Sequence, residues 1–140
     1  MGRQRLQRND VQVFTPTGHV LVTITNLLFH KPWGLAFNRG TPNPHDGSVA
    51  AFFITNVADA TIDRIDILPG QRAPTFRVSQ IGQFARSGLE TKIAVSWVPS
   101  LQLHGTLYSD VLLAIDGAAN RIAAYANSST CDTATMRSTD

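Results

Sequence analysis

Short apolar segments, separated by glycine, proline or small polar residues, follow one another along most of the chain. Most of them alternate apolar and polar positions, which is the period of a half-buried β-strand. The pattern predicts strands over residues 11–15, 19–25, 33–37, 49–56, 61–67, 74–81, 92–98, 101–103, 106–108, 111–115 and 120–125. Residues 49–56 are apolar on both faces and therefore predict a central, buried strand.

The turn residues and the composition favour strands over helices. Pro16 and Gly18 separate the first two segments and predict a hairpin, because proline fixes φ and glycine accepts a positive φ. The spacing at residues 61–67 leaves a bulge or a helical turn open, but the segment is too short for a stable helix, so we favour a strand. Glutamate occurs once and lysine twice, so two residue types that usually populate exposed helix faces are nearly absent.

An internal repeat is the most informative feature of the sequence. A shift of 60 positions places residues 53–62 on residues 113–122. In both copies an apolar strand ends at a side-chain amide or carboxylate (Asn56, Asp116), a small polar turn follows, and the returning strand begins at an isoleucine. Upstream of each copy we align two proline-led segments, residues 32–37 and 99–103. Repeated four-stranded antiparallel units of this length are typical of propeller blades.

These segments resemble the β-propellers built from NHL-like repeats, including bacterial members of that group. The resemblance rests on Pro-Trp-Gly-Leu-Ala-Phe at 32–37, Phe-Ile-Thr-Asn-Val at 53–57 and Leu-Leu-Ala-Ile-Asp at 112–116. It implies an all-β, partial β-propeller of four-stranded antiparallel blades over residues 11–127, an open arc rather than a closed ring. The expected divisions are a basic disordered leader at 1–10, two outer strands of one blade at 11–25, a full blade at 32–83, an incomplete blade at 92–127 and a disordered tail at 128–140.

Charge and cysteine content narrow the class of partner. Lysine and arginine total 12 against 10 aspartate and glutamate, for a net charge of +2, and no basic patch of the kind that nucleic acids need is visible. No apolar run approaches the roughly 18 residues of a membrane span. One cysteine, Cys131, leaves the redox compartment undetermined. The first ten residues lack the apolar stretch of a secretory signal; the localisation stays unknown, although proteins of the resembled group are often secreted.

The chain offers little catalytic or metal-binding chemistry. The four histidines lack the spacing of metal ligands, and we predict no metal site for them and no catalytic residue. Ser100, His104 and Asp110 form a nominal triad without a nucleophile elbow. We expect Trp33 and Trp97 to pack between neighbouring blades. Arg64 and Arg121, at the starts of returning strands, are expected to pair with Asp63, Asp59 or Asp116 across a turn.

Asn56 and Asp116 are the candidate ligand-binding residues, because they end matched strands at one rim. One interpretation is contact with a ligand or with calcium, whose oxygen ligands these side chains could supply. The other is structural: each caps its own turn by bonding to backbone amides two residues on. We favour the structural interpretation. Calcium is thus the one cofactor that the sequence leaves open.

Taken together, these features predict a non-catalytic propeller module that scaffolds or binds through rim loops. Open sheet edges at the two ends of the arc would suit another propeller-forming chain as partner. Two alternatives stay open: a fragment of a propeller-type metal-dependent hydrolase or lyase, suggested by the resemblance alone, and a truncated gene remnant without activity.

Overall fold

The computed structural model describes residues 9–38, 47–84, 93–116, 120–129 and 138–139. These residues form strands and no helix, so the predicted all-β class is confirmed. The strands are β1 (Asp10–Phe14), β2 (Val20–Thr25), β3 (Pro32–Asn38), β4 (Ala50–Asn56), β5 (Thr61–Leu68), β6 (Thr75–Gln83), β7 (Ala94–Leu103), β8 (Thr106–Asp116), β9 (Arg121–Tyr125) and β10 (Ser138–Thr139). A helix of the length and apolarity that crossing a membrane requires does not occur in the described part of the chain.

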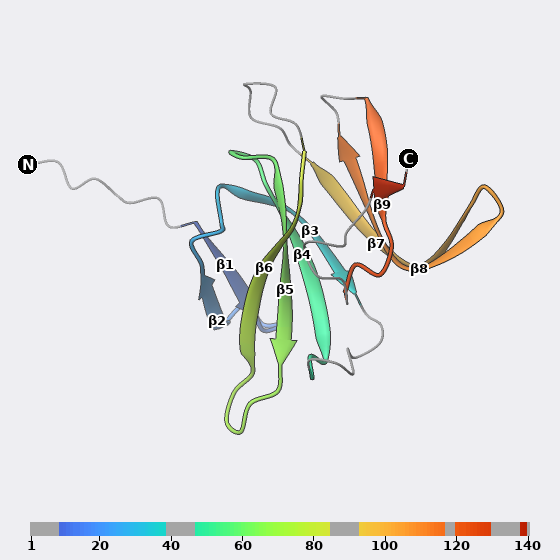
Figure 1. Ribbon diagram of the computed structural model, residues 1–140. Coiled ribbons are helices and arrows are strands. Elements are labelled where there is room, and N and C mark those ends of the chain that lie inside the picture. Colours follow the sequence, from blue (N-terminus) through green and yellow to red (C-terminus); the bar gives the residue numbers. More distant parts are fainter. Residues whose placement is uncertain (1–8, 39–46, 85–92, 117–119, 130–137, 140) are drawn as a thin grey trace, which may run out of the picture.

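The strands form three antiparallel sheets, and none of them closes on itself (Figure 1). β1 pairs with β2, β3 to β6 form a four-stranded sheet in chain order, and β7 to β10 form a second four-stranded sheet in the same order. Within each sheet, strands that follow one another in the sequence are therefore paired. Antiparallel neighbours of this kind need only short connections, which agrees with the glycine and proline residues between the segments.

The pairing register shows that the 60-position repeat extends over all four strands of a sheet. Corresponding pairs are Phe37–Phe52 and Trp97–Leu112, Asn56–Thr61 and Asp116–Arg121, and Arg64–Ser79 and Ala124–Thr139. Each second pair lies 60 positions after the first. The two four-stranded sheets are therefore the same unit, built twice with the same strand order and register.

The proline-led part of the predicted repeat is wrong. The register aligns residues 34–38 with 94–98, and not 32–37 with 99–103. Pro99 lies inside β7 at a point where the pairing with β8 skips from Val98–Val111 to Ser100–Ser109. Proline has no N–H to give to a ladder, so it fits where the ladder is interrupted.

The three short strands that were expected near residues 101–115 belong to two long ones. β7 runs to Leu103 and β8 starts at Thr106, so residues 101–103 continue β7 and residues 106–115 form one strand. His104 and Gly105 make the turn between them with φ of 50° and 81°. Two consecutive positive φ values are the signature of the tight hairpin turn that matches strand twist.

The sheet β3–β6 is the middle layer, with an apolar core on each face. The core against β7–β10 is built around Phe53, Ile62, Ile81, Ile93, Leu112 and Tyr125. The core against β1–β2 is built around Ile24, Phe29, Phe52, Ile54 and Ile65. β4 contributes to both cores, which confirms the prediction of a buried central strand. β5 is a strand as predicted, with a bulge between Ile62 and Asp63 in its pairing with β6.

The two tryptophans have different environments. Trp97 packs against the core between the two four-stranded sheets, as expected. Trp33 does not: its side chain is 53% exposed, so the expectation of packing between sheets is wrong for this residue.

The ends of the described chain differ from the expected leader and tail. Asp10 already pairs in β1, and Asn9 Oδ1 accepts a hydrogen bond from the Lys31 N–H at 3.3 Å. Ser128 and Ser129 are buried by contacts described below, and Ser138–Thr139 pairs with β9 as the fourth strand of its sheet. The remaining residues of the predicted leader and tail (1–8, 130–137 and 140) lie outside the described residues.

Candidate functional site

Asn56 ends β4 and is fully buried, with its amide engaged inside the fold. Its Oδ1 accepts a hydrogen bond from the His30 N–H at 2.9 Å. Its Nδ2 donates to Thr61 Oγ1 at 3.0 Å and to Asp63 Oδ2 at 2.7 Å. These bonds tie the turn after β4 to the loop before β3. The structural interpretation had Asn56 bond instead to a backbone amide two residues on.

Asp63 lies beside Asn56 on β5, and its side chain is also fully buried. Its Oδ1 has no hydrogen-bond partner, while Oδ2 accepts the bond from Asn56. Burial raises the pKa of Asp63 from 3.8 to about 6; the Asn56 hydrogen bond lowers it, and the charge of Asp59 raises it. The folded protein therefore holds a proton on this carboxyl in a range where an exposed aspartate has lost it.

We expect the stability of the protein to fall as the pH rises from about 4 to about 6. The unfolded chain releases the Asp63 proton near pH 4, whereas the folded chain keeps it to about pH 6, so folding binds a proton in this window. The stabilisation that Asp63 contributes is fully present below about pH 4, and about 3 kcal/mol of it is lost above about pH 6. Urea unfolding between pH 4 and pH 8 measures the slope.

The Asp63→Asn variant isolates this contribution, because the amide keeps the shape of the side chain and carries no charge. It should show a flatter pH dependence than the parent and a higher stability at pH 7.5. Asp10→Asn, at the less buried start of β1, serves as the matched control for the loss of one carboxylate. Equal slopes in Asp63→Asn and the parent would refute the assignment.

Asp116 occupies the position in the second sheet that Asn56 occupies in the first. It is nearly fully buried, and its Oδ2 lies 3.5 Å from Arg121 Nε, which confirms the expected pairing of these two residues. Asn56 and Asp116 belong to different sheets, and their proposed role as ligands stays a prediction. In the described segments, no group of three or more histidine, cysteine, aspartate or glutamate side chains is arranged to hold a metal ion.

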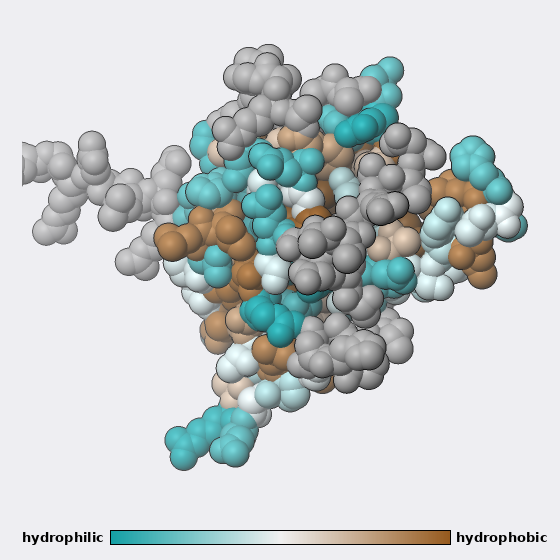
Figure 2. Space-filling model, viewed as in Figure 1, coloured by the Kyte–Doolittle hydropathy of each residue, from teal (hydrophilic) through white to brown (hydrophobic). Residues whose placement is uncertain are grey.

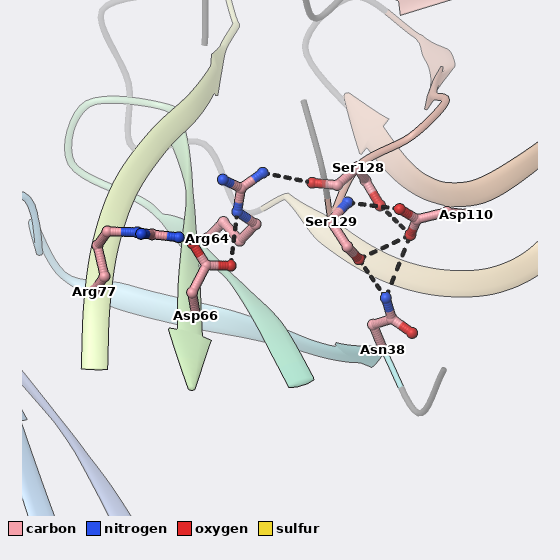
Figure 3. A network of polar contacts seen from close by, with 7 residues as sticks. All are labelled: Asn38, Arg64, Asp66, Arg77, Asp110, Ser128 and Ser129. Carbon is pink, nitrogen blue, oxygen red and sulfur yellow. Dashed lines mark hydrogen bonds and ion pairs between the residues drawn. The ribbon is translucent and has the colours of Figure 1, made fainter. Parts of the chain in front are cut away.

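A polar network that the sequence did not indicate joins the two four-stranded sheets (Figure 3). Asp110 Oδ1 accepts hydrogen bonds from Trp97 Nε1 at 2.7 Å, Ser128 Oγ at 3.0 Å and Ser129 Oγ at 2.8 Å. Asp110 Oδ2 accepts one from the Ser129 N–H at 2.8 Å. Asn38, from the other sheet, donates to Asp110 Oδ1 and to Ser129 Oγ. These hydrogen bonds satisfy polar atoms of Ser128 and Ser129, so both residues can be buried.

A second part of the network is a buried ion pair on β5. Arg64 Nε lies 3.0 Å from Asp66 Oδ1, and both side chains are almost or fully buried. The two atoms meet as an ion pair without a directed hydrogen bond. Arg77 NH2 donates to Asp66 Oδ2 at 3.0 Å, and Arg64 NH1 donates to the Ser128 carbonyl at 3.0 Å. Arg64 thus links β5 to the segment after β9 (Figure 3).

Part of this cluster was accessible to sequence reasoning. Arg64 and Asp66 are two positions apart on a strand, and residues at that spacing lie on the same face. Charged residues on a buried strand face are expected to pair, so this spacing could have predicted the Arg64–Asp66 contact. We expected instead a pairing of Arg64 across a turn. Asp110 gave no such signal, because its partners are distant in sequence.

No family model matches the chain, and no curated protein and no solved structure matches it. The nominal triad of Ser100, His104 and Asp110 is not assembled as a catalytic unit, since His104 lies at the tip of the β7–β8 hairpin and the Asp110 carboxylate is occupied by the network at its base. The buried polar groups hold layers together.

Proposed function

We propose that this chain is a partial β-propeller, an open array of blade-like sheets that acts as a non-catalytic scaffold and binds through loops at one rim. The pairing register that returns after 60 positions is the observation that supports this most directly. A unit that recurs with the same strand order and register behaves as a module in a repeat architecture. The layering of β1–β2, β3–β6 and β7–β10 agrees with neighbouring blades.

The polar groups of the chain support a scaffolding role. Arg64 on β5 bonds to Ser128 of the next sheet's unit, and Asn38 on β3 bonds to Asp110 on β8. Both contacts cross from one unit to the next. Hydrogen bonds from charged and amide side chains fix the position of one layer relative to the next. The polar atoms that make these bonds are therefore engaged within the fold.

The rim part of the proposal concerns the turns that follow β4 and β8. Both turns start at a buried side chain, Asn56 or Asp116, whose contacts anchor the strand end. With the strand ends held in this way, the turn residues between them can differ from copy to copy without disturbing the sheet. Loops carried on a rigid scaffold are where binding residues are most often found.

Lengthening the chain by one repeat unit tests whether the sheets form a modular array. A second copy of residues 32–91 inserted between Thr91 and Lys92 adds one 60-residue unit in register. We expect the longer chain to fold with the same far-UV circular dichroism per residue and a higher urea midpoint, because each added unit contributes one more interface between neighbouring layers. Circular dichroism and urea unfolding of both chains measure this.

A matched insertion carries Phe53→Asp in the added copy only, which places a charge in the new core and should cancel the gain. Aggregation or unfolding of the unaltered tandem chain, while the parent folds, would overturn the modular interpretation. A rise in the parent's melting temperature on adding calcium or zinc would count against the non-catalytic scaffold and for the metal-dependent hydrolase or lyase.

A further inference from the structure

One face of the middle sheet carries two apolar side chains on every strand. Residues paired across neighbouring strands lie on the same face, and the register groups Leu35 and Phe37, Phe52 and Ile54, Ile65 and Ile67, and Phe76 and Val78. The cover of this face is uneven. Ile54 and Ile65 are 3% and 0% exposed, but Leu35 and Phe37 are 65% and 48% exposed. The covering sheet β1–β2 is two strands wide, whereas the sheet beneath it has four.

The sheet β7–β10 shows which strands pack over the equivalent positions when the neighbouring layer has four strands. Val95 and Trp97 stand on β7, 60 positions after Leu35 and Phe37. Both are partly buried and pack against the core between the two four-stranded sheets, because β3 contacts β7. The strands that contact β7 at this place are β3 and β4 of the preceding sheet. In front of Leu35 and Phe37, the equivalent cover would be a hairpin of two antiparallel strands.

An unpaired strand edge borders the same exposed face. β1 pairs with β2 on one side, and among the described residues no strand pairs with its other side. A cleft of about 670 Å³ lies between the sheets, lined by Val13 and Phe14 of β1, Leu21 of β2, Leu35 and Phe37 of β3, and Phe52 of β4. We call this the open cleft. Free backbone groups beside an apolar wall are the setting in which proteins add a strand from a partner.

We propose that the open cleft receives a β-hairpin from a second copy of this chain, namely residues 100–109 at the end of β7–β8. This segment, the hairpin arm, projects from the body of the molecule beyond the interruption at Pro99 (Figure 1). It is already a paired antiparallel ribbon, so docking requires little ordering. In Figure 2 the arm carries brown, apolar patches on its sides and teal, polar surface at its tip.

The chemistry of the hairpin arm fits the open cleft. The pairs Leu101–Tyr108 and Leu103–Thr106 share one face, and on the other face Leu107 is 68% exposed. Residues 100–109 contain no aspartate, glutamate, lysine or arginine, so the arm itself brings no such charge out of water when it docks. Arg72 also lines the open cleft, and in the free protein it is exposed. The inference rests on exposure and pairing and not on the proposed propeller, so the tandem-insertion experiment and the dimer experiment can fail separately.

Two variants separate the arm from the cleft. In the first, residues 101–108 are replaced by Asn-Gly, which joins the Ser100–Ser109 pair by a two-residue turn and removes the arm. In the second, Leu35→Glu places a charge in the open cleft. Leu27→Glu is the matched control, because Leu27 is 94% exposed and lies outside the open cleft. Sedimentation equilibrium gives the association constant of each protein.

We expect the parent and Leu27→Glu to associate alike, and each of the other two variants to associate at least about tenfold more weakly, as loss of a central apolar contact does. The decisive measurement mixes the armless variant, which keeps an intact cleft, with Leu35→Glu, which keeps an intact arm. The mixture should form a complex that neither forms alone. A parent that stays monomeric up to millimolar concentration, or two variants that fail to combine although both fold, would overturn the proposal.

Discussion

Replacing Arg64 by methionine should lower the free energy of unfolding by about 3–5 kcal/mol. Methionine fills much of the volume of arginine but leaves the Asp66 carboxylate, which is fully buried, without its closest cation on the same strand. It also removes the hydrogen bond from Arg64 to the Ser128 carbonyl. Asp66 then keeps only the part-exposed Arg77 as its cation, and a buried charge that has lost its buried partner is among the few causes of so large an effect. Urea unfolding followed by circular dichroism measures the change.

Arg77→Met is the matched control for this prediction. Arg77 also pairs with Asp66, at 3.0 Å, but its side chain is 43% exposed, so its loss should cost about 1 kcal/mol or less. Combining Arg64→Met with Asp66→Leu should recover most of the lost stability, because no charge of the pair then stays buried, and Arg77, which loses its contact with Asp66, is 43% exposed to water. If Arg64→Met and Arg77→Met cost the same, the buried pair is not what stabilises this layer.

The second large effect is expected at Asp110, where substitution by alanine should cost about 3 kcal/mol. The carboxylate accepts bonds from Trp97, Ser128 and Ser129, and bonds to a charged acceptor contribute more than neutral ones. Without it, buried donors on both four-stranded units lose their partner. Asp110→Asn retains one acceptor oxygen and should cost less than Asp110→Ala.

Backbone strain must be separated from hydrogen bonding in this experiment, because Asp110 has a φ of 54°. Alanine tolerates that conformation poorly and would cost about 1 kcal/mol for this reason alone. His104→Ala controls for strain, since His104 has a φ of 50° in an exposed turn. Equal losses in Asp110→Ala and His104→Ala would contradict a role for the network, and a loss at Asp110 that exceeds the control by 2 kcal/mol or so supports it.

Both predictions concern side chains between the layers, where the relation of sequence to structure is most uneven. The Arg64–Asp66 pair is local: two residues on one strand face, readable from spacing once the strand is known to be buried. The Asp110 network is not local. Asn38 and Asp110 are 72 positions apart, and Ser129 is 19 positions beyond Asp110. Asn38 ends β3, Asp110 lies within β8 and Ser129 follows β9, and single polar residues on three separate segments give no periodic signal that they meet.

The sequence by itself determined β1 to β6 and β9, the first hairpin and the 60-position repeat of residues 53–62, because alternation, turn residues and recurrence are properties of neighbouring positions along one chain. It predicted a buried β4 for the same reason, since its residues are apolar on both faces. It missed β10 and divided β7 and β8 into shorter pieces. The tertiary structure alone decided that Pro99 interrupts a long strand, that Asp63 is buried with a raised pKa, and that Leu35 stays exposed while Val95 at the equivalent position is partly buried. Those outcomes depend on which layer lies opposite, and the layer opposite is built from residues far away in sequence.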